Sequence, residues 1–192
     1  MECLQLRIPP LPQFLTAGRS VWSPGQRHFQ RSFEVFDLLI VRSGALYMTE
    51  EQTAYAVRAG EMLLLEPGKS HVGHQSCEEA TDITWVHFKH EPCLARLPER
   101  NVMWSARVRE GRDSDLLPEE QYLYLPKHGA IELKTLQPTL DDILRLRSAL
   151  TMEQALELQL LLVRLLAQLQ ASLRSGRRSS RSSAVAEQVM RY

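Results

Sequence analysis

Residues 60–71 constrain the fold of this chain more than any other stretch. Gly60 opens the stretch, and a strand-length apolar run at residues 62–65 follows. Pro67 and Gly68 then end the run, because proline cannot donate a hydrogen bond to a β ladder and glycine adopts positive φ at little cost. His71 comes three residues after the turn. The stretch therefore predicts a strand and a tight turn with a histidine just beyond it.

Short extended segments separated by turn residues continue from residue 14 to about residue 90. The predicted strands cover residues 14–22, 35–42, 45–49, 53–58, 61–66, 71–75 and 81–89, with a last short strand at 122–125. Strands at this spacing, without helical periodicity between them, predict an antiparallel sandwich or barrel. Residues 92–118 show no clear pattern apart from an expected exposed loop at 111–115.

The periodicity becomes helical after Pro138. Thr139 is the expected N-cap of a first helix, and Thr151 with Gln154 matches a capping box that opens a second. Asp141 and Asp142 in the first turn suit the positive end of the helix dipole.

The second predicted helix is apolar on two sides. One seam contains Ala155 and four leucines at heptad spacing: Leu158, Leu162, Leu165 and Leu169. The other contains Leu156, Leu160, Val163 and Ala167. Because one barrel can cover only one seam, we expect a homodimer. We assign Leu158, Leu162, Leu165 and Leu169 to the partner-facing side, with packing on the chain's own barrel as the alternative.

The composition excludes several classes of protein. The chain of 192 residues carries 23 Lys and Arg against 23 Asp and Glu, so as a whole it does not have the charge of a nucleic-acid binder. We find no signal peptide and no membrane span, and three scattered cysteines form no disulfide framework. These features predict a cytoplasmic protein. The Ser/Arg-rich residues 175–183 predict a flexible linker rather than a phosphate-binding strip.

The order of these elements resembles the AraC-type (arabinose-regulator) family. The likeness is carried by residues 36–44, 60–71, 85–88, 156–169 and 186–192. It implies a mainly β fold with C-terminal helices, in which residues 1–135 form a cupin-like antiparallel jelly-roll barrel and 136–174 form two dimerisation helices. Residues 175–183 would then be the linker. Residues 184–192 would begin a helix-turn-helix DNA-binding domain, and DNA would be bound only through the part of that domain absent from this sequence.

The resemblance also implies a small-molecule effector in the barrel, with sugars as one candidate class. His71 ends the second cupin motif, and Asp37 lies roughly where the first motif of cupins has a glutamate. Trp85 is similar in place to a tryptophan on which a sugar stacks in the family. Because side chains alternate along a strand, His87 should share the face of Trp85.

An entrance arginine completes the expected ligand-binding set. Arg31 is our candidate, and Arg27 is the alternative. No metal or other cofactor is expected, because His71 and Asp37 alone leave a metal without enough ligands and His28 lies too far back in the sequence. His71 could instead be bonded to a backbone group, and Trp85 could be core packing.

No catalytic residues are expected, since the sequence has no Gly-rich phosphate loop and no Ser/His/Asp order. The main alternative is a stand-alone cupin enzyme acting on a small organic substrate. A domain with a vestigial pocket that serves only to dimerise is a third possibility.

Overall fold

The computed structural model describes residues 1–102, 120–148 and 151–189. The loop expected at 111–115 lies outside these ranges. The elements in chain order are β1 (Glu2–Ile8), β2 (Gln13–Trp22), β3 (Arg31–Ser32), β4 (Phe36–Ser43), β5 (Ala45–Glu50), β6 (Thr53–Arg58), β7 (Glu61–Leu65), β8 (Ser70–Gly73), β9 (Thr81–Lys89), β10 (Ala95–Pro98), η1 (Glu99–Asn101), β11 (Gln121–Pro126), β12 (His128–Ala130), α1 (Leu133–Leu146) and α2 (Met152–Val189).

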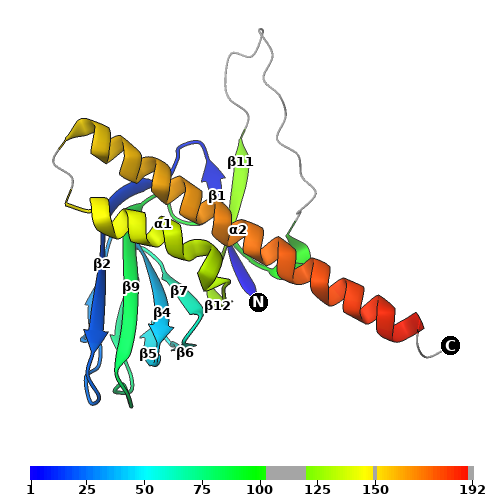
Figure 1. Cartoon of the computed structure of the whole chain (residues 1–192), viewed down its shortest axis with the longest axis horizontal. Coiled ribbons are helices and arrows are strands. Elements are labelled where there is room, and N and C mark those ends of the chain that lie inside the picture. Colours follow the sequence, from blue (N-terminus) through cyan, green and yellow to red (C-terminus); the bar gives the residue numbers. More distant parts are fainter. Residues whose placement is uncertain (103–119, 149–150, 190–192) are drawn as a thin grey trace, which may run out of the picture.

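The strands form three antiparallel sheets. A five-stranded sheet has the order β12-β7-β4-β9-β2, a four-stranded sheet has the order β3-β8-β5-β6, and a three-stranded sheet has the order β10-β1-β11. The two larger sheets enclose a barrel core, and α1 and α2 pass side by side over the strands (Figure 1). The predicted antiparallel jelly-roll barrel followed by two helices is confirmed.

Alternate side chains of β4 enter two different cores, which is why the strand is buried on both faces. Leu39 and Val41 lie inside the barrel, whereas Leu38 and Ile40 face the helices. The barrel core consists mainly of Leu39, Val41, Leu46, Met48, Val57, Leu63, Leu65 and Ile83. On β9, Ile83 joins the barrel core while Val86 and Phe88 join the core beneath the helices, as alternation predicts.

The turn after β7 matches the sequence prediction. β7 ends at Leu65, Gly68 has a φ of 74°, and β8 begins at Ser70. The amide of Gly68 donates to the carbonyl of Phe33, so the turn is tied to the segment that precedes β4. His71 is thereby the second residue of β8, between β3 and β5.

Four strands were missed by the sequence analysis, the short β3 and β12 and the longer β1 and β10. β1 ends at Ile8, immediately before the prolines that made the N-terminus look irregular, and its Cys3, Leu4 and Leu6 are buried. β1 pairs with β10 on one side and with β11 on the other. β10 lies in the stretch whose sequence shows no clear pattern, and it pairs with the distant β1.

The first helix begins earlier than predicted. α1 starts at Leu133 with Glu132 as its N-cap, and Pro138 lies inside it. Thr139 therefore does not cap the helix; it is buried, and its hydroxyl donates to Gln168 Oε1 at 3.0 Å on α2. Burial of Leu136 and Leu140 against α2 and the sheet offsets the one helical hydrogen bond that proline cannot donate. The boundary drawn between residues 135 and 136 thus falls within α1.

The second helix begins as predicted but packs differently. The amide of Gln154 donates to Thr151 Oγ1 at 3.3 Å, as the capping box requires. Our assignment of the first seam to a partner is corrected. Its four leucines are buried in the chain's own core, in one cluster with residues of α1 and of the five-stranded sheet: Leu158, Leu162, Leu165 and Leu169. The second seam is the one exposed to solvent, with Leu156 59% and Leu160 70% exposed.

α2 also continues through the segment expected to be a linker. Residues 175–183 are helical in the structure, as are residues 184–189, whereas 190–192 lie outside the described ranges. Arginine is a good helix former and serine an intermediate one, so Gly176 is the one strong helix breaker in this segment. Among the helices described, none is long and apolar enough to cross a membrane.

Candidate functional site

Aromatic and polar side chains contact one another in what we call the barrel cluster, whose members range from the buried Asp37 and His71 to the exposed Phe29. β4 and β9 place Asp37 opposite His87, and β3 and β8 place Arg31 opposite His71. The cluster includes all five residues predicted to bind a ligand and four that were not predicted: Arg31, Asp37, His71, Trp85 and His87, with Trp22, His28, Phe29 and Phe33.

Asp37 is a buried carboxylate that is only partly satisfied. Its side chain belongs to the barrel face of β4, and the residue is 3% exposed. Asp37 Oδ2 lies 3.4 Å from His87 Nε2, which is long for a hydrogen bond. Asp37 Oδ1 is buried and has no hydrogen-bond partner. This oxygen can accept a hydrogen bond from a bound molecule.

His71 is the second buried group with a free polar atom. The residue is 2% exposed, its Nε2 has no hydrogen-bond partner, and its ring centroid lies 5.3 Å from that of His28 and 5.4 Å from that of Phe33. Burial lowers the pKa of His71, and the positive charge of Arg31 lowers it further, while Asp37 acts in the opposite direction. The imidazole is therefore neutral near pH 7, and its Nε2 is not tied to the backbone.

Arg31 is held in place by aromatic rings rather than by a carboxylate. Its Cζ lies 4.0 Å from the ring centroid of Phe29 and 5.1 Å from that of Phe33. Its Nε is buried without a hydrogen-bond partner. Arg27, the alternative entrance arginine, is exposed. The structure thus places Arg31, and not Arg27, in the barrel cluster.

His28 was thought too far back in the sequence to complete a metal site, but the structure places its ring beside that of His71. The connection between β2 and β4 folds back onto β8, where the amide of Gly73 donates to the carbonyl of His28 at 2.9 Å. His28 Nδ1 donates to the carbonyl of Phe29 at 2.7 Å, so its Nε2 is left as an acceptor. Burial lowers the pKa of His28 to about 4.

Trp85 is packed by its strand neighbours on one side and borders the cluster on the other. It lies directly opposite Gly18 on β2, and a Cβ atom at Gly18 would come within 2.3 Å of the indole. Only glycine leaves room for the ring in this position. The other contact is with His87, whose ring centroid lies 4.9 Å from that of Trp85. Trp85 is thus partly core and partly cluster wall.

A buried ionic network positions the turn that leads to His71. Glu50 Oε1 accepts a hydrogen bond from the amide of Glu66 at 2.7 Å, immediately before Pro67. Lys127 is 1% exposed, and its Nζ contacts Glu50 Oε2 at 2.5 Å and Glu66 Oε1 at 3.2 Å. Arg96 also pairs with Glu66. These contacts fix both ends of the segment that carries His71, since Glu50 is paired with His71 across β5 and β8.

The cluster can hold a small molecule by hydrogen bonds and ring contacts. It offers a carboxylate oxygen, two neutral imidazoles, a guanidinium nitrogen and several aromatic faces. In the part of the chain that the structure describes, no three His, Cys, Asp or Glu side chains are grouped in a way that could hold a metal ion.

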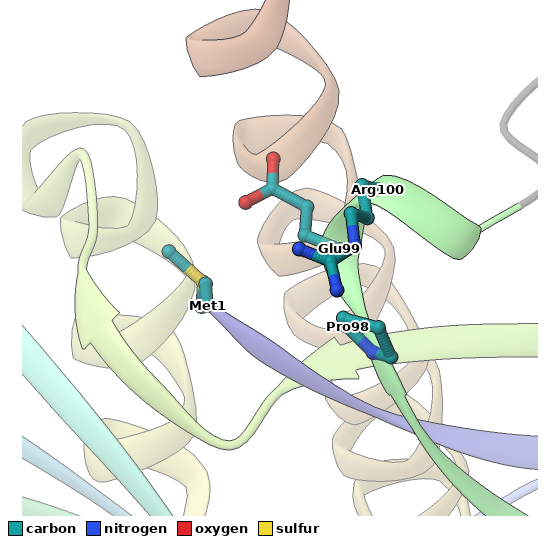
Figure 2. Close-up of a pocket in the computed structure, with 4 residues that line it drawn as sticks. All are labelled: Met1, Pro98, Glu99 and Arg100. Carbon is teal, nitrogen blue, oxygen red and sulfur yellow. The ribbon is translucent and has the colours of Figure 1, made fainter.

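A separate surface pocket lies away from the cluster. It has a volume of about 260 Å³ and is lined by Met1, Pro98, Glu99 and Arg100, from the ends of β1 and β10 and from η1 (Figure 2). None of these four residues is buried. The pocket therefore lacks the buried, unpaired polar groups that distinguish the barrel cluster.

The lowered pKa of His28 predicts a pH dependence of stability. The unfolded chain takes up a proton on this residue at about pH 6.5, but the folded protein does so only near pH 4. Because the unfolded state binds more protons between these values, the free energy of unfolding should fall as the pH is lowered through this window. Urea unfolding of wild type and His28→Gln at pH 4 to 6.5 should show a shallower pH dependence in the variant. Equal slopes would contradict the buried, neutral imidazole.

The comparisons with known proteins agree with this geometry. Residues 16–99 match the AraC-like ligand binding domain family. Over 88 residues the chain is 43% identical to the uncharacterized HTH-type transcriptional regulator YisR of Bacillus subtilis (strain 168), covering 46% of this chain and 31% of that protein. The match therefore spans about a third of the length of this relative.

Solved structures show weaker similarity. The protein YhaK from Escherichia coli has a TM-score of 0.42 at 18% identity, covering 65% of this chain and 45% of that chain. A Bacillus subtilis oxalate decarboxylase OxdC variant has a TM-score of 0.35 at 12% identity, covering 44% of this chain and 29% of that chain. The strand order described above, rather than these likenesses, defines the fold. The match of residues 16–99 to the AraC-like ligand binding domain family, together with the 43% identical HTH-type regulator, supports an N-terminal sensor domain of the AraC type.

Proposed function

We propose that this chain is the ligand-sensing and dimerisation part of an AraC-type transcriptional regulator acting in the cytoplasm. The barrel cluster binds a small-molecule effector, and α2 carries the homodimer contact. The effector controls a DNA-binding domain that follows this region in the intact regulator. The matched family and the regulator YisR support the assignment to this class.

The observation that carries the proposal is the set of buried polar atoms without partners. Arg31 Nε, Asp37 Oδ1 and His71 Nε2 are all buried and all lack hydrogen bonds. Each such atom costs about 1–3 kcal/mol of stability, and more when the group is charged. A fold selected for stability alone would pair these groups or replace them with apolar side chains. A bound ligand that supplies the missing partners recovers this cost.

The alternative of a stand-alone cupin enzyme has less support. Such an enzyme needs a reactive group, either a metal ion or a proton-transfer pair placed at the substrate. The cluster histidines His28 and His71 have pKa values lowered by burial, which weakens them as bases near pH 7. The similarity to a regulator family also favours binding over catalysis.

Ligand binding can be tested by thermal unfolding with a panel of metabolites. An effector should raise the Tm of the wild-type chain, because it binds the folded state alone. Trp85→Ala should lose that rise, since it removes one wall of the cluster. Val21→Ala, at an exposed position of β2, serves as the matched control and should respond like wild type. If no compound raises the Tm, or if Trp85→Ala responds fully, the proposed binding function is wrong.

The homodimer contact is proposed to use the exposed seam of α2. Met152, Leu156 and Leu160 are between 59% and 71% exposed, which is unusual for large apolar side chains grouped on one helix. A second copy of the chain would bury them about a two-fold axis. The leucines of the other seam already hold α2 on its own barrel.

Charge substitutions separate the two seams. Leu156→Glu combined with Leu160→Glu should give a folded monomer, because it places carboxylates at the contact between chains. Leu162→Glu should instead abolish folding, because that position is 0% exposed within the chain. Light scattering reports the mass, and circular dichroism reports the fold. A monomeric wild-type chain, or a double variant that stays dimeric, would show that this seam is not the interface.

A further inference from the structure

Two opposite charges are kept apart inside the barrel cluster. The charges of Asp37 and Arg31 both act on His71: Asp37 raises the pKa of its imidazole and Arg31 lowers it. Yet within the described residues no ion pair of 4.0 Å or less joins Arg31 to Asp37 or to any other carboxylate. Asp37 Oδ1 and Arg31 Nε are each buried and without a hydrogen-bond partner. A direct salt bridge would have satisfied both groups at once.

We propose that the effector is a zwitterion, a molecule that carries an ammonium and a carboxylate group as α-amino acids do. Its ammonium group binds Asp37 and its carboxylate group binds Arg31, so the ligand completes the ion pair that the protein leaves open. This inference rests on the proposed sensing function and specifies the class of compound sensed.

The surroundings of Asp37 suit an ammonium group. Asp37 Oδ1 is an acceptor in a buried setting, where a charged donor stabilises a carboxylate more than a neutral donor does. His87, which lies beside Asp37, is flanked by the rings of Phe33 and Trp85 with centroids at 4.9 Å on each side. Two aromatic rings therefore lie beside the histidine that pairs with Asp37.

The surroundings of Arg31 suit a carboxylate. Phe29 and Phe33 lie against the guanidinium group at 4.0 and 5.1 Å. These ring contacts use none of the N–H donors of the guanidinium group, whose fork geometry matches a carboxylate. The rings also restrict its motion before the ligand arrives, which lowers the entropy lost on binding.

The charge balance of the cluster favours a zwitterion over ligands of other charge. His28 and His71 are neutral near pH 7 because burial lowers their pKa values. Asp37 and Arg31 are the one carboxylate and the one guanidinium group among the nine residues of the cluster. A ligand with a single charge would neutralise one and leave the other unpaired. A sugar would hydrogen-bond to both groups but neutralise neither.

The test is a thermal-unfolding screen sorted by ligand charge. The probes are the proteinogenic amino acids, matched amines and acids that lack one of the two charges, and neutral sugars including L-arabinose and D-glucose. For aromatic side chains the matched set is L-phenylalanine, phenethylamine and hydrocinnamate. We expect the compounds that raise the Tm to be amino acids, and each to bind about tenfold or more tightly than its amine or acid counterpart.

Variants assign each end of the ligand. Asp37→Asn should remove the preference of the site for an amino acid over the matched acid that lacks the ammonium group. Arg31→Gln should remove the preference for an amino acid over the matched amine that lacks the carboxylate group. Arg31→Lys should keep part of the second preference because it retains the charge. The matched controls are the exposed neighbours Glu34→Gln and Arg27→Gln, which should bind like wild type. Without ligand, Asp37→Asn should also raise the Tm, because it removes an incompletely paired buried charge.

The outcomes distinguish this inference from the proposed function. If sugars or singly charged compounds raise the Tm and amino acids do not, the effector is not a zwitterion, although the domain is still a sensor. If no probe of any class raises the Tm, the inference fails together with the sensing function. If Asp37→Asn lowers the Tm without ligand, Asp37 is a structural residue and the ammonium site is wrong.

Discussion

The structure depends on the burial of β4 on both faces. One face of this strand fills the barrel, and the other supports the helices, so a single eight-residue segment joins the two hydrophobic cores. A strand of this kind cannot shift register by one residue without exchanging its two sets of side chains. The same constraint fixes Asp37, because the position shares the barrel face with Leu39 and Val41. The one charged residue on the barrel face of β4 is therefore held in a buried position.

The proposed binding function rests on groups of the barrel cluster that are fixed in position but incompletely bonded. Arg31 lies over the rings of Phe29 and Phe33, Asp37 has a histidine at 3.4 Å, and His71 has an Nε2 without a hydrogen-bond partner. Each group is therefore held in place but incompletely bonded. The rigid backbone around them comes from β pairing and from the Lys127 network behind the Glu66 turn. Preorganised groups of this kind lose little entropy when a ligand binds. The hydrogen bonds that these groups lack in the free protein are the ones that a ligand can supply.

Sequence patterns predicted the parts of the molecule that depend on local chemistry. Alternation along residues 81–89 placed Trp85 and His87 on one face, and the turn at Gly68 placed His71 beyond a strand. The remainder depended on distant partners: β1 and β10 stabilise each other, and His28 reaches the cluster only because its connection folds onto β8. The seams of α2 could not be told apart, because both are apolar and only the packed barrel decides which one it covers.

The most direct test of the account is an NMR titration that follows the side-chain Nε–H signal of Arg31. The probe is the compound that raises the Tm most. We expect the Arg31 signal and the imidazole signals of His71 to shift with a common affinity, while the signal of the exposed Arg27 stays in place. Shifts that leave Arg31 and His71 unchanged and centre on Arg100, at the surface pocket, would contradict the barrel cluster as the binding site.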